Sequence, residues 1–380
     1  DIKIELCVLE SPDTSTANFD RGNVVFQPTT SSFVRFLGNT ILGGSNGLNY
    51  TGGTSSSFRA SGFEFRDNDI EGVYSYGLYL YRLTGAVVED NTVTMRATTW
   101  SSSYSMELSE VEGASRVVGN RLFGGRQYGL NINFCNAVEG SPALIANNMI
   151  ASSSGQTVFL YYSTHINFHH NSVLNTASGD AIQYNGTASA GNRLKNNIFK
   201  ANTGQAVYVS SSTGLVEMDY NDLVTSGTYV GRWGNNYAGD VLEWRSLSSL
   251  DANSISFDPQ FVSDTDLTAS SPALANAGTP LAEVTTDIDG VARKATPSMG
   301  ANEFDSEGLS PLSGTYTIDP AGTGVRNFTT IQSTVDAMIL NGVDGPVVFE
   351  IATGIYEEQV LIKDIAGGSS ANTVTYVPAS

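Results

Sequence analysis

Phe65-Arg-Asp-Asn68-Asp-Ile70 is the pattern that decides the fold of this chain. It returns at Val88-Glu-Asp-Asn91-Thr-Val93, where an asparagine again lies three residues after one apolar residue and two residues before another. Repeats with a period of roughly 20 to 50 residues are typical of proteins built from stacked structural units. The sequence therefore indicates a stack before any single residue is considered for function.

The pattern occurs eight times in the first two-thirds of the chain, at intervals of 23 to 29 residues. Its asparagines are Asn39, Asn68, Asn91, Asn120, Asn148, Asn171, Asn197 and Asn221. Equivalent residues of stacked coils lie about 4.8 Å apart, so inward asparagines could hydrogen-bond from coil to coil. We therefore predict a structural asparagine ladder. The alternative is that asparagine is present only because turns tolerate it.

A second apolar alternation follows most asparagines, as at Gly77-Leu-Tyr79-Leu and Gly129-Leu-Asn131-Ile, and predicts a further short strand in each repeat. A leucine-rich repeat also places asparagine between apolar residues, but it requires another apolar residue eight positions earlier. That position holds Glu112, Gly140 and Thr213 in three of the repeats. The pattern therefore predicts an all-β fold, a parallel β-helix with an asparagine ladder.

Charge excludes two classes of partner. The chain has 19 Lys and Arg against 38 Asp and Glu, which gives a formal net charge of −19. Nucleic acids and anionic membrane surfaces require a basic face, so we expect neither as a partner. No apolar run is long enough to cross a bilayer, and we expect no membrane insertion by this segment.

The second strand of each repeat predicts an outward row of side chains, because alternate residues of a strand face opposite sides of a sheet. This row is rich in aromatic and amide groups and holds one carboxylate. The candidate carbohydrate-facing strip consists of Tyr79, Tyr81, Glu107, Asn131, Phe159, Tyr161 and Tyr208. Aromatic rings stack on sugars and amides hydrogen-bond to hydroxyls, so the strip predicts polysaccharide binding. An ordinary solvated sheet face is the alternative.

Carboxylates are dense only at two neighbouring turns. Asp67 and Asp69 belong to one turn, and Glu89 and Asp90 belong to the next. Stacking of these turns would bring Asp67 near Asp90 and Glu89 near Arg66. Hard oxygen ligands suit Ca²⁺, so Asp67, Asp69 and Asp90 are candidate metal ligands, and no other cofactor is expected. Exposed turn acids without a metal are the alternative.

The pattern changes after Leu223. Residues 240–247 predict a short capped helix, and Asp287-Ile-Asp-Gly290 and Gly300-Ala-Asn-Glu-Phe304 follow it. This order of motifs resembles the closing segment of right-handed β-helix domains in large secreted bacterial proteins, especially those of Bacteroidota. The resemblance implies that residues 1–304 are the C-terminal part of a right-handed, pectate lyase-like parallel β-helix, with the closing segment at about 240–304.

The sequence predicts a linker at residues 305–314 and the start of a second module after it. Apolar residues between Phe328 and Ile339 fall on one helical face, which suits a cap, and residues 347–351 and 354–360 predict strands. This opening is similar to that of pectin methylesterase-like and pectate lyase-like β-helices. The similarity implies that residues 315–380 are the N-terminal cap and first strands of a second β-helix.

Tandem modules of this kind resemble the giant type IX-secreted cell-surface adhesins of Bacteroidota, including those of gliding bacteria. The resemblance implies an extracellular location at the cell surface. It also implies a structural or adhesive role, with further tandem modules of the same polypeptide and surface polysaccharide as partners.

The alternative function is a polysaccharide lyase or glycoside hydrolase on the same scaffold. Hydrolases of this shape need two or three carboxylates on the strand face, and lyases need several acids around Ca²⁺ beside an Arg or Lys. The strip offers Glu107 alone, and the adjacent turn residues His169 and His170 give only a weak signal for a general base. The sequence therefore favours a module that is not an enzyme and has no catalytic residues.

Overall fold

The computed structural model describes residues 2–18, 22–29, 32–53, 55, 58–97, 100–305, 311–358, 360, 362 and 365–379. The chain divides into two compact units. The first contains residues 1–256, 260–269 and 276–303, and the second contains residues 257–259, 270–275 and 304–380.

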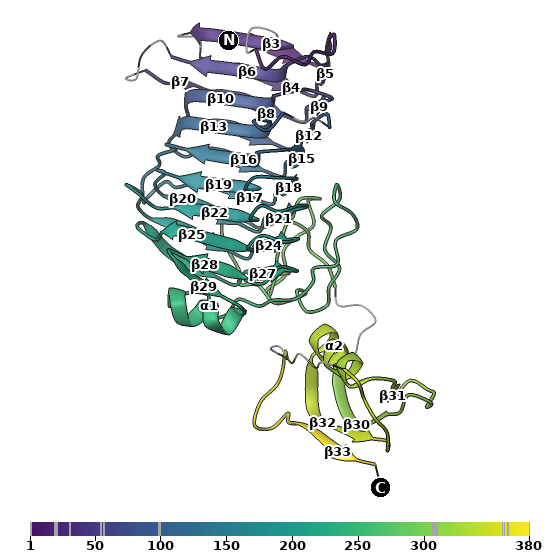
Figure 1. Cartoon of the computed structure of the whole chain (residues 1–380). Coiled ribbons are helices and arrows are strands. Elements are labelled where there is room, and N and C mark those ends of the chain that lie inside the picture. The colour runs from purple at the N-terminus through teal and green to yellow at the C-terminus, as the bar shows by residue number, and fades with distance from the viewer. Residues whose placement is uncertain are drawn as a thin grey trace. The chain divides into compact units, whose positions relative to one another are not determined.

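Three long sheets build the first unit, and each coil of the chain adds one strand to each sheet (Figure 1). The first sheet contains β1 (Ile2–Glu5), β4 (Val34–Leu37), β8 (Glu64–Arg66), β11 (Val87–Glu89), β14 (Arg116–Val118), β17 (Ala143–Ala146), β20 (Ile166–His169), β23 (Asn192–Lys195) and β26 (Leu215–Asp219). The second sheet contains β2 (Val8–Ser11), β5 (Thr40–Gly43), β9 (Asp69–Glu71), β12 (Thr92–Thr94), β15 (Arg121–Gly125), β18 (Met149–Ser152), β21 (Ser172–Asn175), β24 (Ile198–Ala201) and β27 (Asp222–Thr225).

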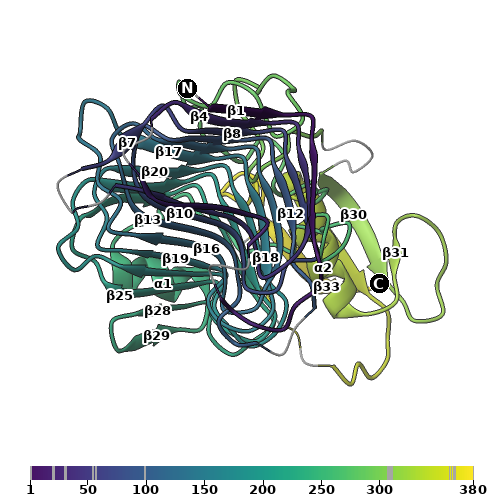
Figure 2. The same ribbon diagram turned by 90° about the horizontal axis from the view of Figure 1, so that it is seen from above.

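The third sheet carries the longest strands and the predicted strip. It contains β3 (Val24–Thr29), β6 (Asn46–Gly52), β10 (Tyr76–Thr84), β13 (Tyr104–Glu112), β16 (Tyr128–Asn133), β19 (Val158–Tyr161), β22 (Ile182–Asn185), β25 (Val207–Ser211), β28 (Gly231–Trp233) and β29 (Asn236–Ala238), and β7 (Ala60–Ser61) pairs with β10. Only β28 and β29 pair in antiparallel fashion among the described strands of the three sheets. Viewed along the axis, the sheets surround one core (Figure 2). The predicted parallel β-helix is confirmed.

The apolar residues on both sides of each asparagine form this core. All of them are exposed by 2% or less, and they are Phe36, Phe65, Val88, Val117, Ile145, Phe168, Leu194 and Met218 before the asparagine and Ile41, Ile70, Val93, Leu122, Ile150, Val173, Phe199 and Leu223 after it. Full burial of such a side chain contributes about 1.5–3 kcal/mol. The stack is therefore stabilised mainly by residues that recur in every coil.

The asparagine ladder is present in the structure. Each side-chain amide donates from Nδ2 to Oδ1 of the asparagine in the next coil, at 2.8–3.1 Å, from Asn39 through to Asn221. The same Oδ1 atoms accept the backbone N–H of the preceding asparagine at 2.9–3.2 Å. All eight residues are exposed by 2% or less. The ladder therefore satisfies buried polar groups at the corner between the first and second sheets.

A left-handed backbone residue precedes each ladder asparagine and turns the chain through this corner. These residues are Gly38, Asp67, Asp90, Gly119, Asn147, His170, Asn196 and Tyr220, with φ between 52° and 72°. Glycine, asparagine and aspartate tolerate this conformation better than most residues. The occurrence of Asp67 and Asp90 at the turns thus has a structural explanation.

A short helix ends the stack. The predicted helix is confirmed as α1 (Val241–Ser248), and the Asp240 side chain accepts the backbone N–H groups of its first turn. Trp244 is fully buried and donates from Nε1 to Asp251 Oδ2 at 2.7 Å. Asp251 Oδ1 also accepts Asn221 Nδ2 at 3.2 Å, so this carboxyl group receives the last amide of the ladder.

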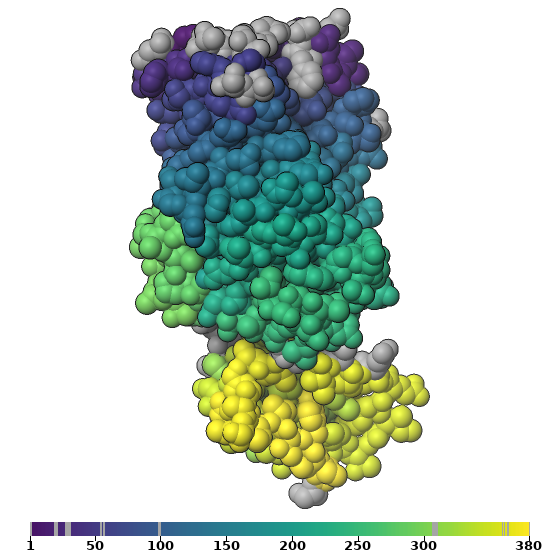
Figure 3. Space-filling view, turned by 90° about the vertical axis from the view of Figure 1, so that its left-hand side faces the viewer, coloured from purple at the N-terminus to yellow at the C-terminus, as the bar shows by residue number. Residues whose placement is uncertain are grey.

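The remainder of the closing segment folds back along the outer faces of the first and second sheets. Leu267, Ile288 and Ala301 pack on outward residues of the second sheet, including Met149 and Leu174. Leu281 and Val284 pack on Leu144 and Ala146 of the first sheet. Figure 3 shows this light green segment against the flank of the coils. Middle strands of these two sheets are consequently buried on both faces.

The second unit is a small parallel sheet with one helix. Its strands are β30 (Leu312–Ile318), β31 (Asn327–Phe328), β32 (Val343–Ile351) and β33 (Val374–Pro378), and its helix is α2 (Ile331–Asn341). The helix confirms the predicted apolar face, since Val335 and Met338 are buried. The strand predicted at 354–360 is wrong, because residues 354–358 form no strand and Glu358 instead caps α2, accepting Ile331 N–H and Gln332 N–H at 2.8 Å. That this unit begins a second β-helix stays a prediction.

No helix among the described residues is both long enough and apolar enough to cross a membrane.

Candidate functional site

The third sheet brings the predicted strip into one register. Tyr79, Glu107, Asn131 and Phe159 are direct neighbours on β10, β13, β16 and β19. Tyr81 and Tyr161 lie two positions further along β10 and β19. Tyr208 follows on β25, two strands beyond Phe159, and the guanidinium carbon of Arg232 lies 4.5 Å from its ring centroid. Because coils are about 4.8 Å apart, the row repeats at a short and even spacing.

A column of tyrosines lies beside this row and was missed from the sequence. Tyr76, Tyr104 and Tyr128 begin β10, β13 and β16, and their ring centroids are 4.7 Å and then 5.2 Å apart. Tyr128 stacks on Phe159 at 5.6 Å, and Phe159 stacks on Tyr161 at 4.5 Å. The available signal was a tyrosine directly before Gly77, Ser105 and Gly129 in three consecutive repeats. The rings form a continuous aromatic surface with the strip.

Glu107 occupies the middle of this surface. It is only 6% exposed, and its Oε2 accepts Asn131 Nδ2 at 2.7 Å. Burial raises the pKa of Glu107 to about 7, although the hydrogen bond from Asn131 acts in the opposite direction. Glu107 therefore changes charge near neutral pH.

The tyrosines around Glu107 remain protonated. Burial, followed by the charge of Glu107, raises the pKa of Tyr76 to about 12 and raises the pKa of Tyr79 further. The pKa of Tyr104 is raised by burial and then by Tyr76 and Glu107. These phenols are therefore neutral rings and hydroxyl donors, and they are unsuited to act as bases near neutral pH.

Buried acceptors on this surface lack hydrogen-bond partners. Among the described residues, the Oδ1 atoms of Asn49, Asn131 and Asn133 are buried and accept no hydrogen bond. Asn49 and Asn131 are exposed by only 7% and 5%. Unsatisfied buried acceptors are costly and are normally paired, so these groups suit the hydroxyl donors of a ligand. The surface is thus aromatic and rich in acceptors, with the carboxyl groups of Glu107 and of Glu110, which accepts the hydroxyl hydrogen bond of Tyr81 at 3.0 Å.

The structure only partly brings together the carboxylates predicted to bind calcium. Burial raises the pKa of Asp90, and the nearby charges of Asp67 and Glu89 raise it further. Asp69 lies on β9, where burial raises its pKa and the neighbouring carboxyl group of Glu71 raises it further. In the described part of the chain, no three His, Cys, Asp or Glu side chains are arranged to hold a metal ion. The calcium assignment stays a prediction.

A polar cleft of about 400 Å³ lies next to Asp90, between the coils and residues 286–290. Several of its charges are paired, since Glu89 pairs with Arg66 and with Arg116, the latter at 2.7 Å. The predicted proximity of Glu89 and Arg66 is confirmed. Asp289, on the loop side of the cleft, pairs with Arg121 at 2.7 Å. This cleft is therefore an ion-paired junction between coils and closing segment.

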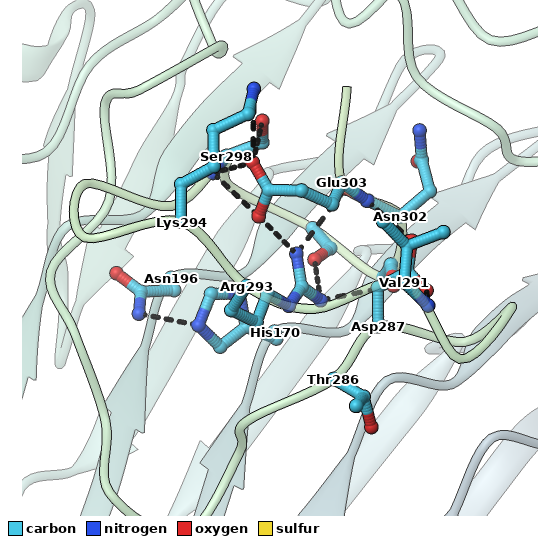
Figure 4. A network of polar contacts seen from close by, with 12 residues as sticks. His170, Asn196, Thr286, Asp287, Val291, Arg293, Lys294, Ser298, Asn302 and Glu303 are labelled. Carbon is cyan, nitrogen blue, oxygen red and sulfur yellow. Dashed lines mark hydrogen bonds and ion pairs between the residues drawn. The ribbon is translucent and has the colours of Figure 1, made fainter. Parts of the chain in front are cut away.

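A buried polar network joins the closing segment to the coils (Figure 4). Arg293 donates to Asn147 Oδ1 at 2.8 Å and pairs with Glu303 at 3.4 Å. His170 lies beneath this network and shares a 2.8 Å hydrogen bond with Asn196. Burial, followed by the charge of Arg293, lowers the pKa of His170 well below its ordinary value. This histidine is a packed structural group and is not accessible as a general base.

The comparisons with known proteins agree with this architecture. Residues 57–223 match the family model described as a right-handed β-helix region. A comparison with curated proteins gives no match.

Proposed function

We propose that the first unit is a structural and adhesive module of a large extracellular protein at the cell surface, and that its third sheet binds polysaccharide. The observation that carries this proposal is the aromatic surface, on which rings recur from coil to coil beside buried amide oxygens without partners. Sugar rings present apolar faces to aromatic side chains and hydroxyl donors to acceptors. A linear glycan presents both along its length, and this sheet offers rings on the consecutive strands β10, β13, β16 and β19.

The structural part of the proposal is supported by the repeated pattern of the coils, whose asparagines and apolar side chains point into the core. The ladder and the apolar residues around it satisfy the interior and leave the outer face of the third sheet free to vary. The type IX-secreted adhesins of Bacteroidota are the proteins proposed as its relatives. Further tandem modules of the same polypeptide are proposed as its neighbours, in line with the presence of a second compact unit formed mainly by residues 304–380.

A glycan array probed with the full chain tests this proposal. We expect binding that weakens about two- to tenfold in Tyr79→Ala and Tyr161→Ala, from the contribution of one aromatic contact. The matched control is Val216→Ala, which removes exposed apolar surface from the first sheet and should leave binding unchanged. Equal glycan binding by all three variants would argue against the strip as the polysaccharide-binding surface.

The same glycans, incubated with the chain and assayed for reducing ends and for unsaturated products, test the enzymatic alternative. Glu107 and Glu110 both belong to this face, but Glu110 is ion-paired with Arg59 and Arg82, so the two carboxylates are not both available as the pair needed for glycoside hydrolysis. We therefore expect binding without turnover. Turnover that is abolished by Asp90→Ala would refute the adhesive module and favour a lyase or hydrolase.

A further inference from the structure

Glu107 is a buried carboxyl group without a cationic partner. Within the described residues, its polar contact is with Asn131, and it forms no ion pair with an Arg, Lys or His. The nearby cations Arg59 and Arg82 pair instead with Glu110, at 3.0 and 3.2 Å. An ionised carboxylate buried without a counter-charge is strongly disfavoured. A cation brought by a ligand would remove this cost.

The side chains around Glu107 are suited to such a cation. Tyr79 on β10 is its direct neighbour in the sheet. The charge of Glu107 also raises the pKa of Tyr104 on its own strand, of Tyr128 on β16 and of Tyr161 on β19, so these three phenols lie within its electrostatic range. Tyrosine rings attract ammonium groups through their faces, and a carboxylate surrounded by such rings adds charge pairing.

The side-chain amide of Asn131, beside Glu107, favours a ligand group that donates hydrogen bonds. Asn131 donates its Nδ2 to the carboxylate, and the carboxylate can only accept, so Asn131 Oδ1 is the atom that remains without a partner. An ammonium group carries three N–H donors, which can serve both Glu107 and Asn131 Oδ1. A carboxylate or sulfate on a ligand could donate to neither and would add negative charge to a chain of net charge −19.

We propose that Glu107, with Asn131 and the surrounding tyrosines, forms a subsite for the protonated amino group of an amino-sugar glycan. This inference rests on the proposed function, because it names the class of polysaccharide that the third sheet prefers. Neutral glycans bind the aromatic surface more weakly, and glycans of uronic acids are rejected.

Isothermal titration calorimetry of the full chain tests the subsite near neutral pH. The probes are oligomers of glucosamine, oligomers of N-acetylglucosamine, neutral glucose oligomers and galacturonic acid oligomers. We expect the glucosamine oligomers to bind about ten- to a hundredfold more tightly than their N-acetylated counterparts, as a charge-assisted contact provides. Glu107→Gln should bring the two affinities together, and Glu71→Gln, an equal charge change on the second sheet, should preserve the difference.

The outcomes separate the two proposals. Equal affinity for acetylated and free amino oligomers in the unmodified chain overturns the amino-group subsite and leaves glycan binding intact. A preference that survives Glu107→Gln also overturns it. Absence of binding to every glycan class overturns the proposed function itself. The comparison of oligomers in the unmodified chain does not depend on the folding of any variant.

Discussion

Replacing one asparagine in the middle of the ladder tests what stabilises the coils. Asn120 is fully buried, donates to Val88 O and Asn148 Oδ1 at 2.9 Å, and accepts Asn91 Nδ2 at 2.9 Å and Asn91 N–H at 3.2 Å. Asn120→Ala removes these four hydrogen bonds and leaves the backbone N–H of Asn91 without a partner. At about 1 kcal/mol for each bond, we expect a loss of about 4 kcal/mol in the free energy of unfolding.

Urea unfolding followed by tryptophan fluorescence measures this loss. All three tryptophans of the chain lie in the first unit, so the signal reports the β-helix alone. The control is Asn136→Ala, an exposed asparagine whose Nδ2 donates to Phe134 O and whose Oδ1 accepts the Thr164 hydroxyl at 3.3 Å, and we expect a change within about 0.5 kcal/mol because water can replace both bonds.

A substitution at the end of the ladder should destabilise the protein less than the same substitution in its middle. Asn39 Oδ1 accepts the backbone N–H of Cys7, which belongs to an exposed residue and can bind water instead. Asn39→Ala should therefore destabilise less than Asn120→Ala. A loss in Asn120→Ala no larger than that in Asn136→Ala would refute the ladder as a source of stability and leave apolar burial as the explanation.

Two further predictions concern charged groups. Arg293→Ala removes the buried guanidinium that pairs with Glu303, although Lys294 stays 3.5 Å from that carboxylate, and it should cost about 3–5 kcal/mol, seen as rapid proteolysis of the closing segment. Arg121→Ala breaks an exposed pair and should cost at most about 1 kcal/mol. The raised pKa of Glu107 means that the folded state holds its proton longer than the unfolded state, so stability should fall as pH rises from about 4.5 to about 7, by about 3 kcal/mol in total. Unfolding free energies of the unmodified chain minus those of Glu107→Gln isolate this slope, and a difference that rises with pH would contradict the burial of Glu107.

The coils could be predicted from the sequence because the pattern that specifies each coil is short and recurs along the chain. An apolar residue, a turn, an asparagine and another apolar residue recur within six positions, as from Phe65 to Ile70, and strand alternation then places Tyr79 and Glu107 on the outer face. The helix over 241–248 was predictable for the same reason, since its cap and apolar spacing are adjacent in sequence.

Burial of individual polar groups was decided only by the tertiary structure. Asp67, Asp69 and Asp90 belong to the densest group of carboxylates in the sequence, yet Glu107, which stands apart from them, is more deeply buried, at 6% exposed. Arg293 reaches Asn147 across 146 positions of the chain, and no periodicity predicts this contact.

The sequence by itself determined that this chain stacks coils around an asparagine ladder, because each coil repeats the same short pattern of apolar residues around an asparagine. The tertiary structure alone decided which outer faces remain free. The closing segment covers parts of the first and second sheets, and the third sheet keeps its row of rings beside Glu107. Long-range packing sets these two outcomes, since the burial of a side chain depends on what neighbouring coils and distant segments place over it.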